Sequence, residues 1–420
     1  MALAAQGTRE VALPGCKSLS ARALILSALA DGESRLHGLS DAEDTRDLAA
    51  ALAGLGVGVD RDPMDGVWRV RGLAGPPRVR GARVDVGAGA ASLRFLLCLL
   101  AAGETDVIVT GSPRLFARPH HALFDFLRSL GTRIDPRTGD GRPGVRVQGR
   151  RLPAGEWRPP LQDSSQFLSG LLLVAGCSGP VFLRLEGPIP SAGYVDLSLE
   201  ALAAFRGPLA VRAEPGGLRV QPGLPAPADL NLPGDPSAAT FFLVALCLRG
   251  GRARLQPPWS PVHPEARLHR SLFDAGLLRG DESGLEATGK LADRPLDFDL
   301  DPAPDAGPAL AVLGAFLPRG ARLRRVARLR LKESDRVQGI LRLLAALGAQ
   351  AELRGEDLWI NGGLQPDGVA SDFDAEDDHR LAMAAGVAAL RCPRLRVLQP
   401  ECVAKSFPRF WKELAPWTTA

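Results

Sequence analysis

The chain has 420 residues, of which 45% are hydrophobic and 23% charged, and its formal net charge is +4. This length exceeds what one compact core holds, so we expect two or three domains, and the composition argues against extensive disorder. The longest apolar run, residues 95–102, is far shorter than the roughly 18 residues that cross a bilayer. With no secretory pattern at the start, we expect a cytoplasmic protein without a membrane partner.

The six cysteines and six histidines show neither metal-ligand nor disulfide spacing. No Cys-x-x-Cys pair occurs, and the adjacent His120 and His121 would point apart on a helix. We therefore predict reduced thiols and no structural metal. The arginines are spread along the chain rather than gathered in a stripe, which argues against nucleic-acid binding. Only five of the 51 basic residues are lysines, so a lysine within a motif suggests that a compact ammonium is needed.

The first predicted elements are a strand at residues 10–13, a Pro-Gly break and an apolar helix. Ser18 or Ser20 is predicted to cap this helix, whose free N–H groups and dipole favour an anion. Lys17 and Arg22 add two positive charges there. The alternative is an ordinary capped surface helix with solvated charges.

A similar segment then recurs six times along the chain. Its helix openings are separated by 74, 73, 72, 71 and 71 residues and fall at Ser18, Ser92, Ser165, Ser237, Pro308 and His379. Each apolar helix is followed by strand-like residues, and most units carry a second helix that ends on glycine, so the unit is read as β-α-β-α-β-β in an α/β (α+β) fold. A helical solenoid is the structural alternative, and the mixture of strand and helix argues against it.

The sixth unit is incomplete because the sequence stops after its predicted helices. We expect the strand at residues 10–13 to cross over and complete it. This predicts an N-terminal domain of residues 14–227 and a C-terminal domain of residues 1–13 plus 228–420, with three units in each. We also expect the six helix openings to converge on one anion-attracting place.

Hydroxyl and charged residues gather at these openings. Ser164, Ser165 and Gln166 open the third repeat helix, and Ser191 follows an apolar strand. Asp305 precedes the fifth helix. The cations at the openings and beside them are Lys17, Arg22, Arg118, Lys332, Arg336, Arg380 and Lys405. This set suits a ligand pair with about four or five negative charges, such as two phosphates and two carboxylates.

The segment after Leu331 holds charges of both signs. Lys332 and Arg336 are expected on one face of a helix, four residues apart, with Glu333 beside them. A carboxylate among so many cations gains an acid or base role.

Six motifs, in order over nearly the whole chain, resemble those of the 5-enolpyruvylshikimate-3-phosphate synthase family. They are Pro-Gly-x-Lys-Ser-x-Ser-x-Arg from Pro14, Arg-Pro at Arg118, Ser-Ser-Gln-Phe from Ser164, Lys-Glu-Ser-Asp-Arg from Lys332, Asp-His-Arg-x-Ala-Met from Asp378 and Ala-Lys-Ser-Phe-Pro from Ala404. The resemblance implies a monomer of two similar inside-out α/β barrel domains with the active site in the cleft between them. It implies no metal and no organic cofactor.

The resemblance also implies the reaction and its residues. The 5-hydroxyl of shikimate 3-phosphate would attack phosphoenolpyruvate, and phosphate would leave. Residues implied for shikimate 3-phosphate are Lys17, Ser18, Arg22, Ser164, Ser165, Gln166, Ser191, Asp305 and Lys332. Those implied for phosphoenolpyruvate are Lys17, Ala90, Arg118, Gln166, Arg336, Arg380 and Lys405. Asp305 would take the hydroxyl proton, and Glu333 with Lys17 would supply one to the methylene.

Five positions depart from the family pattern. Cys16 replaces a Ser, and Arg328 stands where an Asn often contacts the shikimate ring. In the Gly-rich loop, Ala88, Ala90 and Ala91 replace Asn, Gly and Thr. The methyl of Ala90 would crowd glyphosate, a longer mimic of phosphoenolpyruvate, so we expect tolerance to glyphosate.

Two other functions remain as alternatives. A UDP-N-acetylglucosamine enolpyruvyl transferase would share the chemistry, but that family has an Ala-Lys-Asn-type opening and a reactive loop cysteine, which residues 114–118 lack. A non-catalytic binding homologue would fit the altered loop at residues 87–91.

Overall fold

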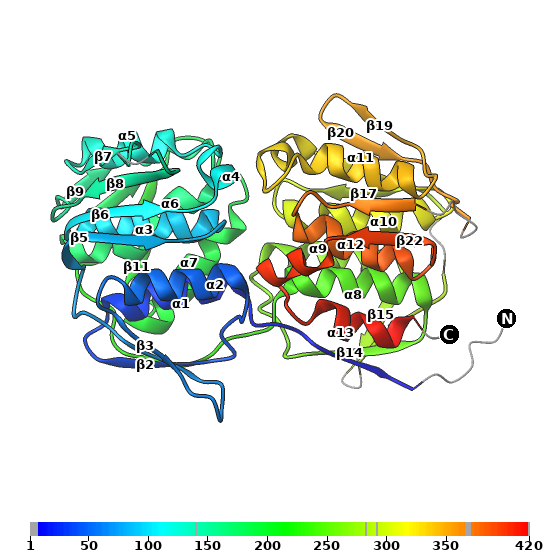
Figure 1. The fold of residues 1–420 in the computed structure, drawn as a ribbon, viewed down its shortest axis with the longest axis horizontal. Coiled ribbons are helices and arrows are strands. Elements are labelled where there is room, and N and C mark those ends of the chain that lie inside the picture. Colours follow the sequence, from blue (N-terminus) through cyan, green and yellow to red (C-terminus); the bar gives the residue numbers. More distant parts are fainter. Residues whose placement is uncertain (1–6, 139–140, 282–283, 291–292, 366–370, 419–420) are drawn as a thin grey trace. The chain divides into compact units, whose positions relative to one another are not determined.

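The computed structural model describes residues 7–138, 141–281, 284–290, 293–365 and 371–418. These residues form two compact units. The N-terminal unit comprises residues 15–232, and the C-terminal unit comprises the chain up to Pro14 together with the chain from Pro233 onward. The chain therefore passes from one unit to the other twice, and the blue strand β1 (Arg9–Ala12) belongs with the green-to-red half of the chain (Figure 1).

The N-terminal unit contains seven α-helices and one 3₁₀ helix among its described residues. They are α1 (Lys17–Leu29), α2 (Glu43–Ala53), α3 (Ala90–Ala102), α4 (Pro113–Phe116), α5 (His121–Ser129), α6 (Ser165–Ala175), α7 (Gly193–Arg206) and η1 (Gly176–Ser178). Its strands are β2 (Glu33–His37), β3 (Gly58–Arg61), β4 (Trp68–Arg71), β5 (Arg78–Asp85), β6 (Glu104–Thr110), β7 (Arg133–Asp135), β8 (Gly144–Gln148), β9 (Gly155–Trp157), β10 (Val181–Arg184), β11 (Val211–Glu214), β12 (Gly217–Val220) and β13 (Asp229–Asn231).

The C-terminal unit repeats the same mixture. Its helices are α8 (Pro236–Arg249), α9 (Pro264–Asp274), α10 (Gly307–Phe316), α11 (Arg336–Ala346), α12 (His379–Ala389) and α13 (Phe410–Leu414), with the 3₁₀ helices η2 (Pro304–Ala306), η3 (Val326–Leu331), η4 (Pro400–Lys405) and η5 (Ala415–Trp417). Besides β1, its strands are β14 (Arg252–Gln256), β15 (Leu278–Asp281), β16 (Gly284–Ala287), β17 (Leu296–Asp299), β18 (Ala321–Arg324), β19 (Ala351–Arg354), β20 (Asp357–Ile360), β21 (Ser371–Asp374) and β22 (Leu395–Leu398).

The sheets share one topology. In β5-β6-β8-β7, the first two strands are parallel and the hairpin β7–β8 adds antiparallel to β6. Four further sheets follow this plan: β13-β2-β4-β3, β9-β10-β12-β11, β1-β14-β16-β15 and β17-β18-β20-β19. The sixth sheet has the parallel pair β21–β22 alone within the described part of the chain. The predicted α/β fold of repeated β-α-β-α-β-β units is confirmed, and it is built from separate sheets with no closed barrel in the part described.

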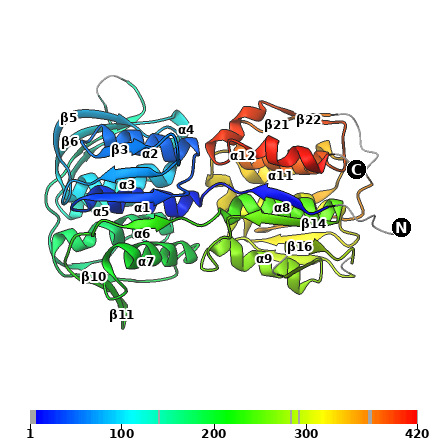
Figure 2. The ribbon, with the colours of Figure 1, turned by 90° about the horizontal axis from the view of Figure 1, so that it is seen from below.

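The first helix of each repeat forms the interior. Helices α1, α3 and α6 pack on one another in the N-terminal unit, and α8, α10 and α12 do so in the C-terminal unit. Figure 2 shows α1, α3 and α6 with β5 and β6 on one side and β10 on the other. These helices are apolar almost all round, which is the pattern of a helix buried on every side. In contrast, α5 buries one face through Leu123, Phe124 and Leu127.

The N-terminal strand completes a different repeat from the one predicted. Strand β1 pairs in parallel with β14, so it joins the sheet of the fourth repeat, and the prediction that it completes the sixth was wrong. Strand β13 takes the corresponding place in the first repeat by pairing with β2. Because β13 belongs to that sheet, residues 228–232 lie in the N-terminal unit, whereas the sequence placed the boundary after residue 227.

Candidate active site

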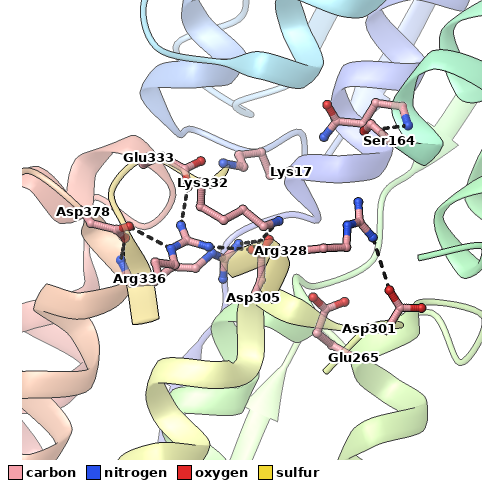
Figure 3. A network of polar contacts seen from close by, with 12 residues as sticks. Lys17, Ser164, Glu265, Asp301, Asp305, Arg328, Lys332, Glu333, Arg336 and Asp378 are labelled. Atoms are coloured by element: carbon pink, nitrogen blue, oxygen red, sulfur yellow. Dashed lines mark hydrogen bonds and ion pairs between the residues drawn. The ribbon is translucent and has the colours of Figure 1, made fainter. Parts of the chain in front are cut away.

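In the C-terminal unit, one carboxylate is surrounded by cations. Asp305 lies in η2, directly before α10. Its Oδ1 is 2.7 Å from Nη1 of Arg336 and 3.2 Å from Nζ of Lys332, and its Oδ2 is 3.0 Å from Nη2 of Arg380 (Figure 3). Lys332 and Arg336 come from one stretch of the chain and Arg380 comes from another, so the tertiary fold gathers these cations around a single acid.

Arg336, the first residue of α11, is the centre of this network and is fully buried. Besides Asp305, its guanidinium donates from Nε to Oδ2 of Asp378 at 2.8 Å and from Nη2 to Oε2 of Glu333 at 2.5 Å (Figure 3). Burial alone would lower the pKa of Arg336, but the charges of Asp378, Glu333 and Asp305 outweigh burial and raise the pKa. The guanidinium is therefore a fixed cation that holds three carboxylates in place.

The opening of α12 fixes a second arginine. Asp378 caps the helix by accepting from the backbone N–H of Arg380 at 3.0 Å, and its other oxygen accepts from Oγ of Ser334 at 2.9 Å. Arg380 is 5% exposed. Burial would lower the pKa of Arg380, and the charge of Asp305 raises it, with a net upward shift.

Lys332 and Arg336 do not share a helical face, contrary to the prediction. Helix α11 begins at Arg336 and is capped by Asp335, which accepts from two backbone N–H groups at 3.1 Å. Lys332 directly follows η3 and lies outside α11. Both side chains still reach Asp305, because the turn before the helix brings Lys332 back toward it.

Two other cations of this unit are paired with acids. Nζ of Lys405, at the end of η4, lies 2.8 Å from the carbonyl oxygen and 2.5 Å from Oδ2 of Asp377. Asp377 has φ +59 and Glu376 has φ +51, a left-handed conformation that non-glycine residues rarely adopt. Arg328, which stands at the usual Asn position, lies with Nη1 3.5 Å from Oδ1 of Asp301 (Figure 3).

In the N-terminal unit, Lys17 is the first residue of α1, and its Nζ lies 2.9 Å from Oδ2 of Asp44. The predicted serine cap is wrong. The residue at the cap position is Cys16, which makes no side-chain cap bond, and Ser18 and Ser20 lie within the helix. The hydroxyl of Ser20 instead accepts from the backbone N–H of Ser40, in the loop after β2, at 3.0 Å. The first turn of α1 therefore has no capping side chain, which leaves its N–H groups available to an anion.

Arg22 is enclosed in the N-terminal unit, at 2% exposure. Its Nε donates to Oγ of Ser198 at 2.8 Å, and Nη2 donates to the carbonyl of Tyr194 at 2.8 Å and to Oγ of Ser169 at 3.2 Å. Nη1 donates to the carbonyl of Ser18 at 2.7 Å. Burial lowers the pKa of Arg22 to about 10, so it stays charged near neutral pH. Most of its donors are occupied, so its main effects are to hold these residues and to supply positive potential.

Sequence reasoning assigned no role to Arg94, which links two of the motifs. Its Nη1 donates to Oε1 of Gln166 at 2.6 Å and to Oγ of Ser164 at 3.2 Å, and its Nη2 donates to the carbonyl of Pro119 at 2.8 Å. Arg94 is 3% exposed and lies in the otherwise apolar helix α3. An arginine inside an apolar run was the available signal, because a buried guanidinium needs several acceptors.

The other expected residues of this unit lie at element ends. Ser164 caps α6 by accepting from the N–H of Gln166 at 3.2 Å, and Ser165 is the first residue of the helix. Ser191 is buried with φ +51 before α7. Arg118 follows α4, a short helix that lies between β6 and this arginine.

The altered Gly-rich loop rests on the start of α2. A Cβ on Gly87 would lie 2.0 Å from Oδ2 of Asp47, and Gly87 has φ +58, so glycine is required there. Oγ of Ser92 donates to the carbonyl of Asp44 at 3.2 Å. Burial, together with the charge of Asp44, raises the pKa of Asp47 to about 6. Ala90, the first residue of α3, is 6% exposed at the end of this loop.

Within the described residues, no group of three His, Cys, Asp or Glu side chains is arranged to hold a metal ion. In the same part of the chain, no helix is both long and apolar enough to cross a bilayer.

Comparison with known proteins shows the family of the chain. The family model of EPSP synthase (3-phosphoshikimate 1-carboxyvinyltransferase) matches residues 5–414. The chain belongs to the EPSP synthase family. It is 35% identical to the 3-phosphoshikimate 1-carboxyvinyltransferase of Syntrophobacter fumaroxidans, over 96% of this chain and 95% of that one. It is 34% identical to that of Ralstonia nicotianae, over 97% and 96% of the two chains.

Solved structures agree on the EPSP synthase fold. The EPSP synthase of Acinetobacter baumannii superposes with a TM-score of 0.74 at 24% identity, covering 98% of this chain and 96% of that one. The enolpyruvyl transferase NikO of Streptomyces tendae superposes with a TM-score of 0.73 at 18% identity, over 98% and 94% of the two chains. At these identities the likeness concerns the fold alone.

Proposed function

We propose that this EPSP synthase family member transfers the enolpyruvyl group of phosphoenolpyruvate to the 5-hydroxyl of shikimate 3-phosphate and releases phosphate. This is the activity named for its curated relatives and belongs to the shikimate pathway. The observation that carries the proposal is the carboxylate of Asp305, which is gathered with Lys332, Arg336 and Arg380. A base beside fixed cations suits the deprotonation of a hydroxyl next to anionic substrates.

Shikimate 3-phosphate is proposed to bind through hydroxyls and backbone N–H groups of the N-terminal unit and through acid–base groups of the C-terminal unit. The proposed residues are Lys17, Ser18, Arg22, Ser164, Ser165, Gln166, Ser191, Asp305 and Lys332. The openings of α1 and α6 supply N–H groups for phosphate. Arg22 and Arg94 keep these elements in position through the hydrogen bonds described above.

Phosphoenolpyruvate is proposed to bind through Lys17, Arg118, Gln166, Arg336, Arg380 and Lys405, with Ala90 against it. Arg336 and Arg380 are almost completely buried, and the pKa of each is raised, so both offer permanent charge to a carboxylate or a phosphate. Lys405 is paired with Asp377 in this structure, so phosphoenolpyruvate would take the place of that acid.

The proposed chemistry follows from these positions. Asp305 takes the proton of the 5-hydroxyl while the hydroxyl oxygen bonds to C2 of phosphoenolpyruvate. Glu333, with Lys17, gives a proton to the methylene carbon. The methyl group then returns a proton to Glu333 as the bond from C2 to the phosphate oxygen breaks. The proton taken up by Asp305 passes to the leaving phosphate, so the enolpyruvyl ether and phosphate remain and both acids are regenerated. The surrounding cations stabilise the anionic substrates and the intermediate.

One assay tests the proposal. Phosphate release should require both phosphoenolpyruvate and shikimate 3-phosphate, and the other product should carry the enolpyruvyl group. Turnover with UDP-N-acetylglucosamine in place of shikimate 3-phosphate would assign the related enolpyruvyl transferase activity instead. Binding of both substrates without phosphate release would mean a non-catalytic homologue. The cytoplasmic location and the monomeric state remain predictions, and size-exclusion chromatography with light scattering checks the second.

A further inference from the structure

Helix α9 of the C-terminal unit borders a cavity that the reaction does not use. The cavity has a volume of about 380 Å³. Its lining consists of Trp259, Ala266, His269, Arg270, Phe273 and Asp274. Five of these residues lie on α9 at the spacing of a single helical face, and Trp259 comes from the segment before the helix. Figure 2 shows α9 at the margin of this unit. The volume is in the range of small-molecule sites.

A buried histidine in the lining has one ring nitrogen without a partner. His269 is 3% exposed, and its Nε2 lies 2.7 Å from Oγ1 of Thr240. That hydroxyl donates its own hydrogen to the carbonyl of Pro236 at 3.0 Å, so Nε2 must carry the proton and Nδ1 is an acceptor. Nδ1 makes no hydrogen bond within the described residues. A buried acceptor without a donor is the kind of group that a bound molecule satisfies.

Aromatic side chains form part of the lining of this cavity. The ring of Trp259 stands edge-on to the ring of His269, with centroids 5.4 Å apart, and both Trp259 and Phe273 are half-buried. Burial lowers the pKa of His269 to about 3, so the imidazole is neutral at ordinary pH. A neutral acceptor in a lining that also contains two aromatic side chains suits a flat apolar group that carries an N–H or O–H donor.

The rim carries one charge of each sign. Arg270 and Asp274 are both exposed, and neither forms a hydrogen bond or ion pair with another residue in the described ranges. They are four residues apart on the same face of α9 and line the same cavity. A guanidinium and a carboxylate so placed match the carboxylate and ammonium groups of an α-amino acid.

We propose that this cavity binds a zwitterionic amino acid whose flat, mainly apolar side chain carries a hydrogen-bond donor. The ring lies between Trp259 and Phe273 and donates to Nδ1 of His269. The carboxylate faces Arg270, and the ammonium faces Asp274. No covalent step is involved, and the site stands independently of the proposed transfer reaction.

Titration calorimetry of the full chain with L-tryptophan tests this site. We expect saturable binding of one molecule per chain. Arg270→Gln and Asp274→Asn should each weaken it by roughly tenfold or more, the equivalent of losing one charged contact. Arg267→Gln is the matched control, because Arg267 lies on the same helix outside the lining, and its affinity should equal that of the unmodified protein.

Two further ligands test the role of His269 Nδ1 without any substitution in the protein. L-Phenylalanine has the charges and a ring but no ring donor, so it should bind several-fold more weakly than L-tryptophan. Indole has the donor and no charges, and it too should bind more weakly. The proposal is overturned by an absence of saturable L-tryptophan binding, by binding that both charge variants leave unchanged, or by equal affinity for the three ligands.

Discussion

The two units hold their site cations in different ways. In the C-terminal unit, Arg336 and Arg380 are buried against carboxylates, and Asp305 accepts from both. In the N-terminal unit, Arg22 and Arg94 are equally buried, but their partners are hydroxyl, amide and carbonyl oxygens, together with one histidine nitrogen. The first arrangement places acids beside buried cations, whereas the second keeps neutral groups in position around positive potential. We infer that the C-terminal unit mainly supplies the chemistry and the N-terminal unit mainly supplies binding.

The largest expected effect concerns the acid of the C-terminal unit. Asp305→Asn keeps the shape of the side chain but removes the base, so turnover should fall by roughly 10³-fold. Phosphate release at saturating substrates measures it. Asp301→Asn is the matched control, since Asp301 has a similar exposure and pairs with Arg325 and Arg328 outside the network. Near-normal turnover of Asp305→Asn would remove the base from the proposed mechanism.

The second test concerns stability in the same network. Arg336→Met leaves the fully buried Asp378 without its cation, so we expect a loss of about 3–5 kcal/mol in the free energy of unfolding. Urea denaturation measures it. Arg342→Met, on the exposed side of α11, removes a surface pair with Glu376 and should cost less than about 1 kcal/mol. Equal losses for the two variants would contradict the inference that the buried pair of Arg336 and Asp378 stabilises the fold more than a surface pair does.

A change in the N-terminal unit should affect binding rather than turnover. Ser165→Ala removes one proposed phosphate contact at the opening of α6, so KM for shikimate 3-phosphate should rise about tenfold with kcat nearly unchanged. Steady-state kinetics with each substrate varied in turn measures it, and KM for phosphoenolpyruvate serves as the internal control. A fall in kcat with an unchanged KM would contradict the division of labour between the units.

Ala90 tests the loop that departs from the family pattern. Ala90→Gly removes a methyl at the start of α3, so glyphosate should inhibit the variant several-fold to about tenfold more strongly, with a smaller change in KM for phosphoenolpyruvate. Inhibition titrations of the two proteins check this. If the unmodified chain is already as sensitive as a glycine-type relative and the substitution changes nothing, the expected tolerance is wrong.

The smallest effect concerns the neighbouring α2 and depends on pH. The pKa of Asp47 is raised to about 6, so the folded protein binds this proton more tightly than the unfolded chain does. The contribution of protonated Asp47 to the free energy of unfolding is therefore complete below about pH 4 and is lost as the pH rises through 6. Asp47→Asn should add about 1 kcal/mol at pH 8, since the side chain is only half-buried, and nothing near pH 4. Urea midpoints at both pH values measure it, and an equal gain at both would contradict the cause given.

Much of this architecture follows from local sequence. Six apolar runs at a nearly constant interval predicted six buried helices, because a helix that is apolar on all sides has to be covered by other elements. The resemblance of six motifs predicted the family. What local patterns could not show is which strand pairs with which: β1 is adjacent in sequence to α1 but hydrogen-bonds to β14, more than 200 residues away.

The residues of the charged network were likewise visible in the sequence, but the pairing of these residues was not. Glu333 and Arg336 are close in the chain, but Asp305, Asp378 and Arg380 reach them only because η2 and the openings of α11 and α12 meet. Arg94 shows the same limit, since its partners lie 25 to 72 residues away. Periodicity and propensity are set by neighbouring residues and are read from the chain, whereas a buried ion takes whichever partners the packed elements bring within hydrogen-bonding distance.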